Sequence, residues 1–335
     1  MVTLVTWLLP VKNGMPYLRE TLASIAAQTY SNWEILAWDN GSTDGTVEEL
    51  HRWIPSRLPG KVITGHPLSL GNCLAEMVKQ CETELCARID ADDINLPERL
   101  ATQVEFLHQH PEIAVVGTQV YSIDEHGLNY GLWQPYPLHH DDIVDLFMRG
   151  CVMWHPSVLF RRSKVLEVGN YQDTFMDGLR SPTEDYDLWL RMACRYPLAN
   201  LAQPLLQYRA HSRSITQTNS KIKAADGCFC RNAPALYGCS EQDARLLREW
   251  RHPQAVQVLK QIAAYLQQTQ NSSTSDRLRS SSFIKAGRQM MSSKQVIPCL
   301  TWAMLNPNKF SVLAELLTLS DRGWSLLRSQ QLTNP

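Results

Sequence analysis

The chain has 335 residues, a formal net charge of −1, 44% hydrophobic residues and 19% charged residues. A chain of this length and composition can bury a sizeable core, which excludes global disorder. Its near-neutral charge argues against nucleic-acid binding, because proteins that bind nucleic acids usually present a basic face.

The N-terminus and the cysteines predict a cytoplasmic protein. Residues 1–11 lack both a basic region before the apolar run and a small-residue cleavage site, so we expect a buried strand there and no signal peptide. No apolar stretch approaches the roughly 20 residues that span a bilayer. The nine cysteines include no C-x-x-C pair, which favours reduced thiols.

The first third of the chain alternates apolar runs with helical patterns. Strands are expected at residues 2–11, 33–38, 61–64 and 85–89, and helices follow them at 16–25, 44–50, 70–77 and 97–107. Asp44 is placed to cap the second helix. This alternation predicts an α/β domain with a doubly wound, mostly parallel sheet, whose ligands lie outside the carboxyl ends of the strands.

From residue 113 the pattern changes. Further strands are expected at 113–123, 151–160 and 201–208, with a helix at 184–195. The segment 271–282 is rich in Ser, Thr and Asn, which is typical of a linker or loop.

An acidic cluster follows the fourth predicted strand. Asp90, Asp92 and Asp93 place three carboxylates at one strand end, where their mutual repulsion is costly unless a cation neutralises it. Carboxylate oxygens suit Mn²⁺ or Mg²⁺, which commonly bridge protein carboxylates and substrate phosphates. The alternative is an acidic loop that caps the next helix. Arg88 could form an ion pair with Asp90 or Asp92, or approach a diphosphate.

Several motifs together resemble family 2 glycosyltransferases of the GT-A fold. The stretch 39–46, Asp-Asn-Gly-Ser-Thr-Asp-Gly-Thr, is similar to a motif of that family, and so are residues 10–14, 87–100, 154–157 and 184–191, in the right order. The resemblance implies a GT-A domain over residues 1–220, with a nucleotide-binding half at about 1–110 and an acceptor half at about 111–220. Residues 221–335 would then be a helical C-terminal extension.

The resemblance also implies a reaction. An inverting, metal-dependent enzyme would move a sugar from a nucleotide-sugar donor, in first place a UDP-sugar, to a hydroxyl group of a glycan or lipid-linked glycan. The expected setting is the synthesis of a cell-surface polysaccharide. The sequence does not specify the sugar, the base or the acceptor, although the loop 119–146 is expected to help select them.

By the same resemblance, the nucleotide-sugar is bound at the ends of the first, second and fourth strands. The residues implied are Pro10, Val11, Asn13, Asp39, Asn40, Asn72, Arg88, Asp90, Ala91 and Asp92. Two positions depart from the family pattern. Asn40 stands where the family often has an aspartate, and Lys12 stands where an aromatic residue often stacks on the base. For Asp39 the alternative is turn formation, and for Asn72 it is a polar position at a helix start.

The catalytic base is placed by the resemblance at Asp185, with Glu184 as the second candidate. Asp187 is interpreted as a solvated or capping residue. His211 is a candidate fourth metal ligand beside Asp90, Asp92 and Asp93. On the acceptor side, His155 is either a packing residue or an acceptor contact. Trp189 is expected in the core, with stacking on a sugar as the alternative.

The last third matches no motif. Basic residues dominate 277–294, and apolar residues recur at helical spacing over 302–317. They predict either a helical subdomain with a solvated basic face or an interfacial helix that holds the protein peripherally on the inner face of the cell membrane.

Two other functions are open to this sequence. A sugar nucleotidyltransferase also uses an α/β sheet and metal-bound carboxylates, but it normally has a Gly-rich basic phosphate loop near the N-terminus, and residues 12–14 are too short for one. A non-catalytic nucleotide-sugar-binding assembly partner would have no need of the intact acidic residues.

Overall fold

The structure is a computed structural model. It describes residues 3–133, 135–147, 150–176, 179–181, 183–211, 221–237 and 241. The basic segment 277–294, the apolar segment 302–317 and the linker 271–282 lie outside the described residues.

The N-terminal part alternates strands and helices as the sequence predicts. Its elements are β1 (Val5–Val11), α1 (Leu18–Ala26), β2 (Trp33–Asp39), α2 (Thr46–Trp53), β3 (Gly60–Thr64), α3 (Leu70–Gln80), β4 (Leu85–Arg88), β5 (Ile94–Asn95) and α4 (Arg99–Gln109).

The part that follows has shorter elements. They are β6 (Val115–Ile123), β7 (Asn129–Leu132), α5 (His140–Phe147), the 3₁₀ turn η1 (His155–Ser157), β8 (Leu159–Arg161), α6 (Arg162–Glu167), β9 (Thr174–Met176), β10 (Leu179–Ser181), α7 (Glu184–Ala193), β11 (Leu198–Arg209) and α8 (Lys221–Tyr237).

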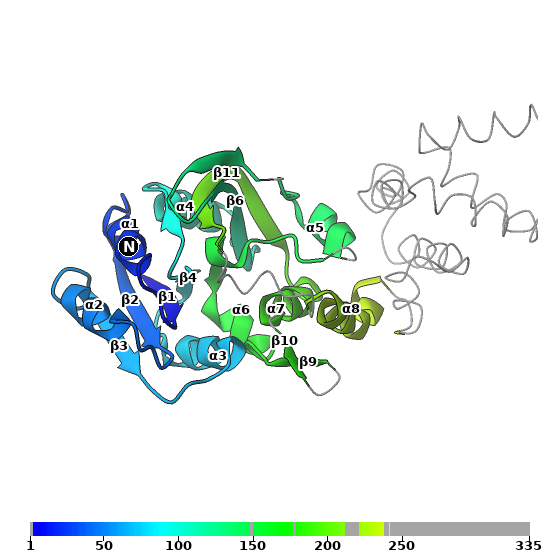
Figure 1. Ribbon diagram of the computed structural model, residues 1–335. Coiled ribbons are helices and arrows are strands. Elements are labelled where there is room, and N and C mark those ends of the chain that lie inside the picture. The colour runs from blue at the N-terminus through cyan, green and yellow to red at the C-terminus, as the bar shows by residue number, and fades with distance from the viewer. Residues whose placement is uncertain are drawn as a thin grey trace, which may run out of the picture. The chain divides into compact units, whose positions relative to one another are not determined.

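One mixed sheet organises these elements, in the order β3-β2-β1-β4-β8-β6-β11-β5, with β7 paired to β6. Strands β3, β2, β1 and β4 follow one another in Figure 1. Strands β3, β2, β1 and β4 are mutually parallel, and so are β6 and β11. The short strand β8 runs antiparallel between β4 and β6. Because β8 opposes both neighbours, β4, β6 and β11 all end at the same edge of the sheet as β1 and β2.

Both faces of the sheet are covered. Alternate residues of β1, namely Val5, Trp7, Leu9 and Val11, join one hydrophobic cluster with apolar residues of α1, α2 and α4. Helix α3 packs against β1 and β2 and buries Leu74, Met77 and Val78. This two-sided burial explains why β1 is a nearly continuous apolar run rather than an alternating one.

The predicted strands of the first third agree with the structure to within a few residues. One prediction in the second part is wrong: residues 151–160 do not form one strand. Pro156 lies in η1, and β8 begins only at Leu159. Proline cannot donate a ladder hydrogen bond, so the apolar run bends into a turn before it joins the sheet.

Residues 1–143 and 151–228 form one compact unit, which contains the sheet. Residues 144–150 and 229–335 belong to a second unit, and of these the structure describes only the ends of α5 and α8 and residues 150 and 241. Among the described helices, none combines the length and apolar character needed to cross a membrane.

Candidate active site

The loops after β1 and β2 are tied together by side chain to backbone hydrogen bonds. The Asn13 backbone N–H donates to Ser42 Oγ at 2.8 Å, and the Thr43 N–H donates to Asn13 Oδ1 at 2.9 Å. Asp44 accepts from the Met15 N–H at 3.0 Å and from the Thr46 N–H at 3.2 Å, but the N-cap position of α2 is Gly45, not Asp44 as predicted. The two loops therefore form one preorganised rim at the carboxyl ends of β1 and β2.

Asp39 and Asn40 both form hydrogen bonds with the backbone of this rim or of the segment next to it. The buried Asp39 carboxylate accepts from the N–H groups of Gly41 and Ser42. The Asn40 amide donates to the Leu68 carbonyl and accepts from the Leu68 N–H, each at 2.7 Å. An amide can donate one hydrogen bond and accept the other, whereas a carboxylate can only accept. This gives a physical reason for asparagine at a position where the family that the sequence resembles often has aspartate.

The other residues implied at the nucleotide differ in exposure. Pro10 and Val11 are buried in β1, whereas Lys12 is exposed. Asn72 is exposed in the first turn of α3, and its Nδ2 donates to Asp173 Oδ2 at 3.0 Å. The helix start here is capped by Ser69, whose hydroxyl accepts from the Asn72 N–H at 3.1 Å.

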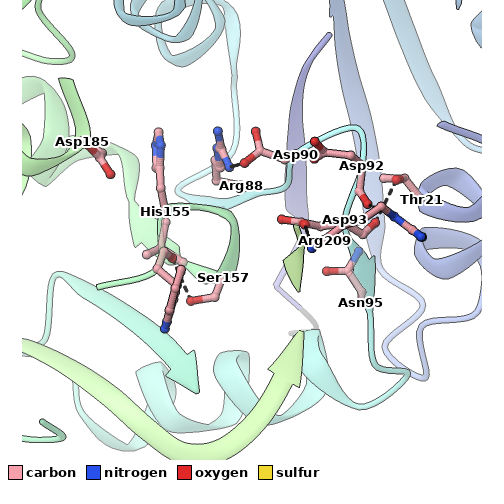
Figure 2. A network of polar contacts seen from close by, with 12 residues as sticks. Thr21, Arg88, Asp90, Asp92, Asp93, Asn95, His155, Ser157, Asp185 and Arg209 are labelled. Carbon is pink, nitrogen blue, oxygen red and sulfur yellow. Dashed lines mark hydrogen bonds and ion pairs between the residues drawn. The ribbon is translucent and has the colours of Figure 1, made fainter. Parts of the chain in front are cut away.

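The acidic cluster lies between β4 and β5. One carboxylate oxygen of each of Asp90, Asp92 and Asp93 lies within 4.8 Å of the others, a spacing compatible with a shared metal ion (Figure 2). The side chains of Asp90 and Asp92 are about one-third exposed, at 32% and 33%, while Asp93 is fully buried. Ala91 is partly buried between them.

Three buried arginines support this loop. Arg88 forms an ion pair with Asp90, which was one of the alternatives left open by the sequence. The Arg209 backbone N–H donates to Asp93 Oδ1 at 2.8 Å, and its guanidinium donates to the Asp92 carbonyl at 2.8 Å and to Glu20. Arg99 donates to the Arg88 carbonyl at 2.7 Å, which fixes the end of β4. Its pKa is lowered to about 9, mainly by burial and further by the Arg88 charge.

Without a cation, burial and mutual repulsion disfavour the charged forms of the carboxylates in the cluster. Burial raises the pKa of Asp93 well above its usual value, and the charges of Asp92 and Asp90 raise it further. The pKa of Asp92 is also raised, by burial and by Asp90, although His211 opposes the shift. Asp93 Oδ2 is buried and has no hydrogen-bond partner among the described residues. An all-oxygen set with an unsatisfied buried oxygen fits Mn²⁺ or Mg²⁺.

His211 lies beside this cluster, on the segment that follows β11. Its Nε2 is 2.9 Å from Asp92 Oδ2, and its ring packs against Tyr17 at a centroid distance of 5.1 Å. The imidazole is thus placed either to orient Asp92 or to reach an ion that Asp92 holds.

Glu184 and Asp185 open helix α7 on the other side of the site. Glu184 is buried, and its pKa is raised to about 8, first by burial and then by the adjacent Asp185 charge. Asp185 is partly exposed; its Oδ1 accepts from the Tyr186 N–H at 2.7 Å, and the Cys151 thiol lies 4.0 Å from its Oδ2. At neutral pH Glu184 is therefore mostly protonated, and Asp185 is the more accessible carboxyl group.

In Figure 2, Arg88 and His155 lie between Asp185 and the acidic cluster. His155 is buried, and its Nε2 hydrogen-bonds the Tyr171 hydroxyl at 2.9 Å. Burial, with the nearby Arg88 charge, lowers its pKa well below the usual value, so the ring stays neutral. These contacts correspond to the packing alternative for His155.

The structure shows the surroundings of two further residues of α7, Trp189 and Asp187. Trp189 is 0% exposed and meets His155 and Tyr171 edge to face, so it belongs to the core and cannot offer a stacking surface to an acceptor. The interpretation of Asp187 as a solvated group is wrong. Its carboxylate is buried and accepts from Arg191 Nε at 2.8 Å, because the two residues lie one helical turn apart.

Sequence reasoning missed Arg99, Arg209 and Cys151. One sequence signal could have pointed to Arg209: it is a basic residue at the end of a strand, two residues before His211. Nothing in the sequence pairs it with Asp93, because the two are 116 residues apart.

Comparison with known proteins gives one consistent result. A family model described as Glycosyl transferase family 2 matches residues 6–169. The amylovoran biosynthesis glycosyltransferase AmsE of Erwinia amylovora is 33% identical over 203 residues, which cover 60% of this chain and 73% of that protein. The O-antigen biosynthesis glycosyltransferase WbnJ of Escherichia coli is 31% identical over 206 residues, which cover 60% of this chain and 78% of WbnJ.

Solved structures share the fold. S. aureus TarS 1–349 in complex with UDP-GlcNAc superposes with a TM-score of 0.59 at 16% identity, covering 77% of this chain and 80% of that one. The mannosyltransferase PcManGT from Pyrobaculum calidifontis, in complex with GDP-Man and Mn²⁺, superposes with a TM-score of 0.52 at 15% identity, covering 93% and 86%.

Proposed function

Since the chain belongs to glycosyl transferase family 2 and is a glycosyltransferase of the GT-A fold, we propose that it transfers a sugar with inversion from a nucleotide-sugar donor to a hydroxyl group of a glycan acceptor. The proposal includes a divalent cation, Mn²⁺ or Mg²⁺, at the acidic cluster. A UDP-sugar is the donor that we propose first.

One observation supports this proposal above the others. Three carboxylates converge at the carboxyl end of β4, where ligands of such sheets bind, and two of them reach solvent. Asp90, Asp92 and Asp93 are the residues that would hold the cation, and His211 would orient Asp92 or complete the ligand set. When bound, the cation would offset the negative charge that develops on the diphosphate leaving group.

The donor's nucleotide is proposed to lie on the rim formed by the loops after β1 and β2. Asp39 keeps acceptor capacity beyond its bonds to Gly41 and Ser42, so it can also accept from a base N–H or a ribose hydroxyl. TarS and PcManGT are described with UDP-GlcNAc and GDP-Man respectively, so the solved structures of this fold include both uridine and guanosine donors.

The chemical step needs one base and no enzyme nucleophile. We assign the base to Asp185, which would take the acceptor hydroxyl proton as that oxygen bonds to the sugar carbon and the diphosphate leaves from the opposite face. Glu184 is a poorer base because its raised pKa keeps it protonated near pH 7. When Glu184 is protonated, the protein does not bury a negative charge next to Asp185.

The acceptor is proposed from the relatives. AmsE and WbnJ are named for amylovoran and O-antigen biosynthesis, and both of these are glycans of the cell surface. We therefore propose a growing surface polysaccharide, free or lipid-linked, as the acceptor.

The decisive test is a donor panel. Purified protein is incubated with UDP-, GDP- and dTDP-sugars in Mn²⁺, and release of the nucleoside diphosphate is measured with and without excess EDTA. We expect turnover of at least one donor that EDTA abolishes. Diphosphate release from a nucleoside triphosphate and a sugar phosphate would instead establish a nucleotidyltransferase, and binding of a donor without turnover would favour a non-catalytic partner.

A further inference from the structure

An aromatic cluster lies at the edge of the acceptor half and has no role in the site as described so far. Trp133, directly after β7, meets Trp154 and Tyr208 at centroid distances of 5.4 and 6.1 Å. Tyr136 stacks on Trp154 at 5.2 Å and 21°. We call these four residues the aromatic wall. Trp133 is its most exposed indole, with 39% of the residue accessible.

The aromatic wall is held rigidly. The Trp133 backbone N–H donates to the Val120 carbonyl at 3.0 Å. The Gln119 side chain accepts from the Tyr136 N–H at 2.8 Å and donates to the Tyr136 carbonyl at 3.0 Å. Asn200 Nδ2 donates to the Pro137 carbonyl at 2.8 Å. A ring held in this way loses little conformational freedom when a ligand binds, which favours affinity.

Residues next to the wall contact both chemical groups of the site. Tyr208 immediately precedes Arg209, whose backbone N–H binds Asp93. At the other end, Asn200 Nδ2 donates to the carbonyls of Pro137 and Val152 at 2.8 and 3.1 Å, and the neighbouring Cys151 thiol lies 4.0 Å from Asp185 Oδ2. Trp154 lies between Tyr136 and Tyr208 in the wall.

The geometry leaves the indole of Trp133 available. Among the described residues, two rings meet it, at steep angles of 78° and 79°, so neither of them stacks parallel on it. A core aromatic residue would be covered on both faces, as Trp189 is. An aromatic ring with an apolar face and a polar edge suits a ligand that is itself apolar on one face and hydroxylated at its rim.

We propose that Trp133, backed by Trp154 and Tyr208, is a stacking subsite for a pyranose ring of the acceptor glycan. This inference rests on the proposed function and deepens it: the sugar ring lies against the indole while its hydroxyl group is directed toward Asp185. The subsite selects acceptors by ring shape and has no part in holding the nucleotide.

The test separates acceptor from donor. The variants are Trp133→Ala, Trp133→Phe and the control Tyr130→Ala. Tyr130 is an aromatic residue of the same hairpin, 66% exposed, whose hydroxyl hydrogen-bonds Asp124. The probes are methyl pyranosides of glucose, galactose, mannose, rhamnose and N-acetylglucosamine. Binding is followed by saturation-transfer NMR, and transfer by mass spectrometry of the product.

We expect Trp133→Ala to raise the acceptor KM by about tenfold or more, which corresponds to about 1.4 kcal/mol, while the donor KM and the rate of donor hydrolysis by water stay within twofold of wild type. Trp133→Phe should recover part of the loss, and Tyr130→Ala should behave like wild type. Thermal unfolding checks that all three variants are folded.

Equal acceptor KM and equal saturation transfer for wild type and Trp133→Ala would overturn the subsite, even if donor turnover is normal. An equal loss in Tyr130→Ala would also overturn it, since the effect would then belong to the hairpin surface. So would flotation of wild type, but not of Trp133→Ala, with anionic vesicles while the acceptor KM stays equal, because the aromatic wall would then contact lipid. Absence of donor hydrolysis in wild type would count against the proposed function instead, and the NMR arm would still test the subsite.

Discussion

The rim that follows β1 and β2 and the start of α7 use their polar residues in opposite ways. On the rim, the side chains of Asn13, Asn40 and Asp44 are bonded to the backbone of a neighbouring loop 28–30 residues away. At α7, Asp185 accepts from the N–H of the next residue and stays partly exposed. The rim is thus a scaffold built by side chains, whereas α7 presents one partly exposed carboxylate, which we propose as the base. Substitutions on the rim should therefore cost stability and binding, and those at Asp185 should cost turnover alone.

The largest effect should come from Asp185→Asn. Asparagine is close in size and keeps hydrogen-bonding capacity, but it cannot accept a proton at neutral pH, so sugar transfer should fall by about 10²–10⁴-fold. Nucleotide affinity by calorimetry and the melting temperature should not change. Transfer within a few-fold of wild type would remove Asp185 as the base, and the same assay on Glu184→Gln would then show whether the neighbouring carboxyl group has the role.

Arg209→Met should test the scaffold that joins the two halves. The buried guanidinium donates to the Asp92 and Asp124 carbonyls and to Glu20, and methionine fills part of its volume without these bonds. We expect the free energy of unfolding to fall on the order of 3 kcal/mol in urea titrations. Arg52→Met is a matched control, because Arg52 pairs with Glu49 at an exposed position. A variant as stable as the control would show that Arg209 does not secure the acidic loop.

Asp92→Asn should weaken both nucleotide binding and turnover, in contrast to Asp185→Asn. Loss of one charge at the acidic cluster should reduce the Mn²⁺-dependent affinity for UDP, GDP or dTDP by roughly 10–100-fold. Calorimetry in Mn²⁺ and then in EDTA measures this. If wild type binds its best nucleotide equally well in both buffers, the metal assignment of Asp90 and Asp92 fails.

Glu184 should make stability depend on pH. Its folded pKa of about 8 lies above the model-compound value of 4.5, so the folded state binds the proton more tightly. Its stabilising contribution is complete below about pH 4.5 and is lost as the pH rises toward 8. Glu184→Gln should therefore flatten the fall in unfolding free energy between pH 5 and 8, by on the order of 3–4 kcal/mol. Parallel pH profiles for variant and wild type would contradict the assigned protonation.

The smallest effect is expected on the rim itself. Asn40→Asp keeps the acceptor for the Leu68 N–H but replaces the donor to the Leu68 carbonyl with a second carboxylate oxygen. We expect a loss of about 1 kcal/mol in unfolding free energy, with transfer nearly unchanged. A gain in nucleotide affinity without loss of stability would show instead that this position contacts the base directly.

The sequence predicts the parallel half of the fold well and the mixed half poorly. Strands β1, β2, β3 and β4 are local apolar runs, and the acidic cluster is marked by its place at a strand end. The position of β8 could not be predicted, because an apolar run does not reveal the direction or the neighbours of a strand. Likewise, two buried arginines that support the cluster, Arg99 and Arg209, are indistinguishable in sequence from surface arginines.

The site, like the fold, could be predicted from the sequence only in part. Motif position correctly brings Asp90, Asp92 and Asp93 together, yet it cannot distinguish a substrate contact from a structural bond. Asn13 and Asn40 belong to motifs, and their side chains already have backbone partners. Trp133 belongs to no motif. It is identified by the exposure of its side chain and by the angles of its ring contacts, and both are properties of the folded chain. The catalytic and binding roles themselves remain predictions.

The hydrogen bond between Asp93 and Arg209 sets an order of events during protein synthesis. It joins residues 116 positions apart, and β5, just after the acidic cluster, pairs with β11 as well. At typical rates of translation, the aspartates leave the ribosome on the order of 10 s before their arginine. The nascent chain therefore carries all three carboxylates of the acidic cluster before the contact with Arg209 can form. A fragment ending near residue 110 should likewise lack a formed cation site, although it contains every carboxylate of the cluster.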